Sequence, residues 1–188
     1  MQRQKTAEDS LFRHILTADP GSRSVMDIRD QKLMNNPFMV RAIQLSIEGS
    51  HSGLGGPFGA VIVRDGKILA EGVNRVTSTN DPTAHAEVVA IRQACKELGV
   101  FELKDCELYT SCEPCPMCLG AIYWARLARI YFANTAQDAA KIGFDDSFIY
   151  SELKLSPSLR SIPTIQMMRE QALAAFRAWS EKADKIPY

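Results

Sequence analysis

The chain has 188 residues, the length of one domain with a substantial core, and 46% of them are hydrophobic. Lysine and arginine together number 22, as do aspartate and glutamate, so no overall positive field attracts nucleic acid or an anionic membrane. The longest apolar runs, such as the one over 59–63, are far shorter than a bilayer span. The composition therefore predicts neither a membrane protein nor a mainly disordered one.

The N-terminal segment over 1–35 carries little periodicity. Its first residues are charged where a secretory peptide needs an apolar stretch, so we expect no export and a cytoplasmic location. Turn-forming residues at 19–22 interrupt the segment. It is predicted to be an extension that carries at most short helices and no chemistry.

The segment over 36–70 begins the predicted domain. Apolar residues at helical spacing predict a helix over 36–48, and a glycine-rich connection follows. Two strand-like runs, 60–63 and 68–70, then flank an Asp65-Gly66 pair, which is a strong hairpin signal. Two antiparallel strands are predicted here.

Helical and strand-like segments alternate through the rest of the chain. Such alternation calls for parallel strands joined by crossovers, with helices on both faces of the sheet, so we predict a three-layer α/β/α domain over 36–188. The predicted segments are a helix over 84–98, a strand over 106–110, a helix over 115–124, a strand over 130–133, a helix over 138–142, a last strand over 164–167 and an amphipathic helix over 170–183.

The cysteines suggest a metal site. The chain has five, an odd number that disfavours a pure disulfide framework. Cys115 and Cys118 are spaced i and i+3 at the start of a predicted helix, so they share a face, and the helix dipole there favours thiolates. His85 lies at the start of another predicted helix. If both helix starts point at one ion, these three residues provide a zinc site with three protein ligands.

Three protein ligands leave one tetrahedral position for water, which distinguishes a catalytic zinc from a structural one. Zinc lowers the pKa of a bound water towards ~7. Glu87 lies two residues after His85, where its carboxylate can accept the proton of that water, deliver it to a ring nitrogen and protonate a leaving amine. A His-x-Glu followed by Pro-Cys-x-x-Cys is the signature of zinc nucleobase deaminases.

The cysteines allow two other interpretations. A ferredoxin-type cluster needs a fourth cysteine at position 122, which is Ile122. A structural zinc site closed by Cys112, Cys106 or His51 remains the stronger alternative, but it gives Glu87 no role. Cys112 is predicted to be a small residue packed where a strand ends.

Four stretches, over 55–63, 80–87, 110–124 and 142–149, make the chain similar to a known family. The middle two define the cytidine-deaminase-like superfamily, and the last, which contains Gly-Phe-Asp-Asp, resembles the guanine deaminases within it. The resemblance implies a cytidine-deaminase-like fold with a five-stranded mixed sheet, a homodimer, and hydrolysis of guanine to xanthine and ammonia. It also implies zinc held by His85, Cys115 and Cys118, with Glu87 as the proton shuttle.

The same resemblance assigns the purine contacts. Asn74 is expected to hydrogen-bond the base, and Asp146 to recognise its polar edge and assist proton transfer. Phe58 and Trp124 are expected to line or stack on the planar ring. The C-terminal Tyr188 is expected to help close the pocket, and members of this family lend that tail to the partner subunit.

Other functions remain open on the sequence. The nearest is another deaminase on the same scaffold, acting on guanosine, cytosine or adenosine in transfer RNA. Zero net charge and the paired Asp145 and Asp146 disfavour RNA, because carboxylates near the site repel phosphates. Guanosine is not excluded, because related nucleoside deaminases share Gly-Phe-Asp-Asp. A non-catalytic, zinc-stabilised interaction module is the alternative from a different class.

Overall fold

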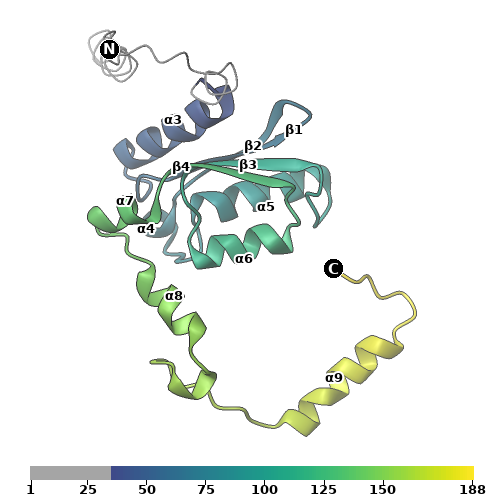
Figure 1. Cartoon of the computed structure of the whole chain (residues 1–188). Helices are drawn as coiled ribbons and strands as arrows, with labels where there is room; N and C mark the ends of the chain where they lie inside the picture. The colour runs from purple at the N-terminus through teal and green to yellow at the C-terminus, as the bar shows by residue number, and fades with distance from the viewer. Residues whose placement is uncertain (1–34) are drawn as a thin grey trace, which may run out of the picture. The chain divides into compact units, whose positions relative to one another are not determined.

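A four-stranded sheet with the order β2-β1-β3-β4 is the centre of the fold (Figure 1). The structure is a computed structural model that describes residues 35–188, so the extension predicted over 1–35 lies, except for its last residue, outside the described residues. Strand β1 (Gly59–Arg64) pairs antiparallel with β2 (Lys67–Val73), as predicted. The turn between them places Asp65 at φ 51° and Gly66 at φ 70°, the left-handed backbone that a type I′ hairpin requires.

Strand β3 makes the sheet mixed. It spans Cys106–Cys112 and pairs antiparallel with β1 on one side and parallel with β4 (Arg129–Asn134) on the other. Helix α6 (Pro116–Trp124) forms the crossover between the two parallel strands. The sheet therefore combines the hairpin and the crossover that the sequence predicts.

Helices cover both faces of the sheet and give the predicted three layers (Figure 1). Helix α3 (Pro37–His51) packs on one face, where Ala42 meets Val61 and Val63 in a buried cluster. Helix α5 (Ala86–Leu98) packs with α6 on the other face, where Ala60 and Ile62 belong to a second buried cluster. Alternate residues of β1 thus face opposite layers, as the pleat of a strand dictates.

Local signals set the starts of the two helices that carry the metal-ligand motifs. Helix α5 begins directly after His85, and it is capped after Leu98 by Gly99, whose φ of 65° is left-handed. Helix α6 begins directly after Cys115, with Pro116 in its first turn, where a missing N–H costs no hydrogen bond. Both motifs therefore lie at helix N-termini, as predicted.

The prediction of a fifth strand over 164–167 is not met in this chain. That segment has no strand structure, and Ile165 is 78% exposed, so the sheet has four strands where five were expected. A strand exists only where a neighbour pairs with its N–H and C=O groups, and among residues 35–188 no strand pairs with this segment.

The chain after β4 is more helical than predicted. Helix α7 spans Ala136–Lys141 and the final helix α9 spans Arg169–Glu181, close to their predicted positions. Helix α8 (Ser147–Lys154), the short 3₁₀ turn η1 (Pro157–Leu159) and, earlier in the chain, α4 (Val76–Thr79) were not predicted. Within residues 35–188 none of the helices has both the length and the apolar character needed to cross a membrane.

Candidate active site

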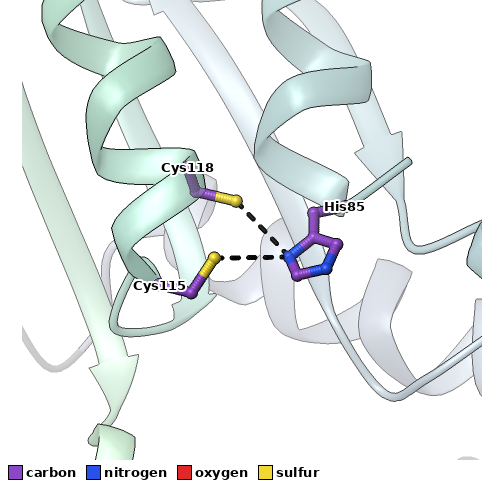
Figure 2. A group of neighbouring side chains, drawn as sticks. All are labelled: His85, Cys115 and Cys118. Carbon is purple, nitrogen blue, oxygen red and sulfur yellow. Dashed lines mark hydrogen bonds between the residues drawn. The ribbon is translucent and has the colours of Figure 1, made fainter. Parts of the chain in front are cut away.

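The metal-ligand residues meet at the N-termini of α5 and α6 (Figure 2). Nδ1 of His85 lies 3.5 Å from Sγ of Cys115 and 3.5 Å from Sγ of Cys118. A tetrahedral zinc with Zn–N and Zn–S bonds of about 2.05 and 2.3 Å places its nitrogen and sulfur ligands about 3.6 Å apart. The spacing and the donor set therefore fit a zinc ion, and these three residues form the zinc site.

The two sulfurs do not have the same acidity in the metal-free protein. The pKa of Cys115 is lowered to about 4, chiefly by the hydrogen bond from Cys118 and also by that with His85. The same bond, together with burial, raises the pKa of the Cys118 thiol. The pair therefore holds one proton, which zinc displaces when it binds both sulfurs as thiolates.

No further side chain closes the site as a fourth ligand within residues 35–188. The group whose ligand atoms lie within 4.8 Å of one another contains only His85, Cys115 and Cys118. The Cys112 thiol instead donates to the carbonyl of Thr135 at 3.6 Å, and burial raises its pKa to about 11. Cys112 is thus a packed residue, as predicted, and the alternative of a structural site closed by Cys112, Cys106 or His51 is not supported.

Glu87 lies beside the ligands in the first turn of α5 and is 6% exposed. Its Oε2 is 3.4 Å from Sγ of Cys118, and its Oε1 is 3.3 Å from Oγ1 of Thr110. Burial raises the pKa of this carboxyl group. A carboxyl group with a raised pKa, next to a metal site, is suited to taking up and returning a proton.

A cavity of about 490 Å³ opens onto the site, a volume typical of small-molecule pockets. Its lining includes His85, Glu87 and Cys115, so the zinc site and the carboxylate face the same space. The structure also places three of the predicted purine contacts in this lining: Phe58, Asn74 and Asp146.

Asn74 is a buried amide in the cavity lining. Its Oδ1 accepts hydrogen bonds from the backbone N–H groups of Gly56 and Val76, each at 3.2 Å. Gly55 makes this arrangement possible, because a Cβ atom there would lie 2.3 Å from Oδ1. With the oxygen occupied by two donors, the Nδ2 amide remains to donate to a ligand.

Asp146 lies at the start of α8, where burial, and then the charge of Cys115, raises the pKa of its carboxyl group. Phe58 meets Phe144 edge to face, with ring centroids 4.9 Å apart. Phe144 and Glu113 both line the cavity, yet neither was predicted as a site residue. Phe144 lies in the Gly-Phe-Asp-Asp sequence and Glu113 in the Cys-Glu-Pro-Cys sequence, and these two motifs could have identified them as site residues.

Trp124 and Tyr188 lie outside the cavity lining of their own chain. Trp124 is 67% exposed and Tyr188 is 72% exposed, and their rings are 5.9 Å apart. The structure therefore brings these two predicted contacts to each other but not to the other site residues.

Comparisons with known proteins agree with this geometry. Residues 34–134 match the family described as the cytidine and deoxycytidylate deaminase zinc-binding region. The guanine deaminase of Bacillus subtilis is 58% identical over 151 residues, which cover 80% of this chain and 97% of that protein. A tRNA-specific adenosine deaminase of Agrobacterium fabrum is 49% identical over 82 residues, which cover 44% of this chain and 53% of that protein.

Solved structures show the same relationship. The X-ray structure of the Bacillus subtilis guanine deaminase matches with a TM-score of 0.79 and 55% identity, covering 87% of this chain and 99% of that one. The guanine deaminase of Nitrosomonas europaea matches with a TM-score of 0.56 and 28% identity, covering 69% of this chain and 79% of that one.

Proposed function

The chain belongs to the cytidine and deoxycytidylate deaminase zinc-binding family, and from this premise we propose that it hydrolyses guanine to xanthine and ammonia. The observation that carries the proposal is that two of the zinc ligands, His85 and Cys115, line one cavity with Glu87, and that Asn74 and Asp146 line the same cavity. Hydrolysis needs the zinc site and Glu87, and selection of a purine base needs Asn74 and Asp146.

The reaction adds water to the carbon that bears the amino group and expels ammonia. Zinc, when bound, acts as a Lewis acid that makes hydroxide available at neutral pH. Glu87 takes one proton of the attacking water and passes it to the adjacent ring nitrogen. It then carries the remaining proton of the added hydroxyl group to the amine, which leaves as ammonia while the carbonyl forms. Its position, buried next to Cys118, keeps the proton close to the reacting carbon and away from bulk water.

The other cavity residues bind and orient the base. Nδ2 of Asn74 donates to an acceptor on the purine, because its oxygen is already used by the backbone. Asp146 accepts from an N–H group of the base and assists proton transfer. Phe58, held by Phe144, packs against the planar ring. A base that lacks the matching groups leaves these buried polar atoms unpaired, which lowers its affinity.

The charge of the cavity disfavours transfer RNA, on which the Agrobacterium relative acts by its name. The acidic residues Glu87, Glu113, Asp145 and Asp146 line the cavity, and among residues 35–188 no lysine or arginine does. A nucleic-acid site needs positive groups that meet phosphates. A free base or nucleoside carries no phosphate, and guanosine is the second candidate substrate on this scaffold.

The test is ammonia release by the zinc-loaded protein from guanine, guanosine, cytosine, adenine and a transfer RNA anticodon stem-loop with adenosine at the wobble position. Guanine is expected to be the preferred substrate, with the other bases turned over much more slowly. Release from guanosine alone would contradict the substrate while leaving the chemistry intact. No release from any of these compounds would support the non-catalytic zinc module instead.

We further propose that two copies form a homodimer in which the C-terminal tail reaches the partner. None of the residues of α8, η1 and α9 is buried, although Phe176 and Trp179 of α9 are large apolar side chains. Exposed apolar surface of this extent is typical of an interface. In the dimer, the segment over 164–167 forms the fifth strand of the sheet beside an edge strand such as β4, and Tyr188 with Trp124 completes the partner's cavity.

Complementation between two inactive chains tests this exchange. One chain carries Glu87→Gln with an intact tail, and the other has an intact site but lacks residues 164–188. Co-refolded, they are expected to regain ammonia release, because the first chain lends its tail to the second. The wild-type protein should have about twice the 20.9 kDa mass of one chain in solution. A monomer, or a mixture that stays inactive, would contradict the proposal.

A further inference from the structure

Thr110 is a polar residue in an apolar row of the central strand β3. Residues at positions 106, 108, 110 and 112 of a strand face the same side of the sheet, and Cys106 and Leu108 belong to the buried cluster under α5 and α6. Thr110 is 1% exposed. Its backbone pairs with Ala60 of β1 on one side and Phe132 of β4 on the other, so its position is fixed by both neighbouring strands.

The hydroxyl group of Thr110 points at Glu87. Its Oγ1 donates to Oε1 of Glu87 at 3.3 Å, while Oε2 of the same carboxyl group lies beside Cys118. A buried hydroxyl group requires a partner, and this bond provides it. Thr110 itself is not part of the cavity lining, so it does not touch a ligand there.

We propose that Thr110 is a positioning residue that holds the Glu87 carboxyl group by one oxygen and keeps the other turned towards the metal site. The proposal rests on the function proposed above.

The bond restrains the Glu87 carboxyl group, which could otherwise rotate about its bond to the side chain. The Thr110 hydroxyl group can act as a fixed donor because its strand is paired on both sides. Proton transfer depends on the orientation of the accepting oxygen, so an unrestrained carboxyl group slows the reaction without weakening binding of the base.

The experiment compares Thr110→Val, which keeps the shape and removes the hydroxyl group, with Thr110→Ser, which keeps the hydroxyl group. We expect Thr110→Val to lower kcat for guanine by about 10- to 100-fold, the effect of misplacing a catalytic group, with little change in KM. Thr110→Ser should restore most of the loss. Both variants should bind as much zinc as the wild type, and Thr110→Ala gives the same comparison should the valine variant not fold.

Ser111 provides the matched control, because it is the next residue and faces the other layer. Its hydroxyl group accepts from the backbone N–H of Gly59 at 3.0 Å, and within residues 35–188 it bonds neither Glu87 nor a zinc ligand. Ser111→Ala is expected to lower the melting temperature but not kcat.

Three outcomes overturn the proposal: a Thr110→Val variant with the kcat of the wild type, a serine variant as slow as the valine variant, or a Thr110→Val loss that persists at full size in a Glu87→Gln background. In that background the two losses should not add, because Thr110 acts through Glu87. Failure of the wild-type protein to release ammonia from guanine would instead refute the proposed function, so the two failures are distinguishable.

Discussion

Replacement of Glu87 by glutamine is expected to lower the rate of ammonia release from guanine by a factor of about 10² to 10⁴, the usual contribution of general acid–base catalysis. Glutamine has nearly the same shape and still accepts the hydrogen bond from Thr110. It cannot take up a proton from water, so both proton transfers lose their carrier. The rate is measured as ammonia released per zinc-loaded site.

Zinc content separates this effect from damage to the metal site. Glu87 is outside the ligand group, so the variant should hold as much zinc as the wild type. Glu113→Gln is a suitable comparison, because Glu113 also lines the cavity, but its Oε2 accepts from the backbone N–H of Ala136 at 3.0 Å. Its effect on the rate should be much smaller. A Glu87→Gln protein that retains both its zinc and its rate would remove the proton shuttle from the mechanism.

Replacement of Cys118 by serine is expected to abolish both zinc binding and activity. A serine hydroxyl group stays protonated at neutral pH and is a poor zinc ligand, and a site with three protein ligands has none to spare. Because a bound metal stabilises the folded state by mass action, the melting temperature should fall as well. Metal analysis of the purified protein and a thermal unfolding curve measure the two effects.

Cys112→Ser is the matched control for this variant, since Cys112 is also buried and lies six residues earlier in the chain. Its thiol donates a hydrogen bond to the carbonyl of Thr135 and is not one of the zinc ligands, so the variant should keep its zinc. The assignment would be wrong if Cys112→Ser lost the metal, or if Cys118→Ser kept a full complement of it.

The zinc site could be predicted from the sequence because its geometry depends on local signals. Pro116 favours the start of α6, and His85 and Cys115 are the residues that directly precede the two helices. Helices α5 and α6 pack side by side on one face of the sheet, and their N-termini then bring the three ligands together. Phe58, Asn74 and Asp146 line the cavity, and they were predicted as purine contacts from the resemblance to a family. The spacing of residues along the chain does not by itself predict their position.

Features that depend on distant contacts could not be predicted in the same way. The segment over 164–167 looks like a strand, but pairing partners decide whether it becomes one. The bond between Thr110 and Glu87 joins residues 23 positions apart and depends on how α5 packs over β3. A threonine in an otherwise apolar row of a strand was the signal that could have identified it.

The central claim is a zinc ion held by one imidazole and two thiolates, with the fourth position left to solvent. X-ray absorption at the zinc K-edge of the zinc-loaded wild-type protein measures the ligands directly. The expected spectrum contains two sulfur scatterers at about 2.3 Å and two nitrogen or oxygen scatterers at about 2.0–2.1 Å. A spectrum with three or four sulfur scatterers would show that a further cysteine closes the site, and would contradict the catalytic account.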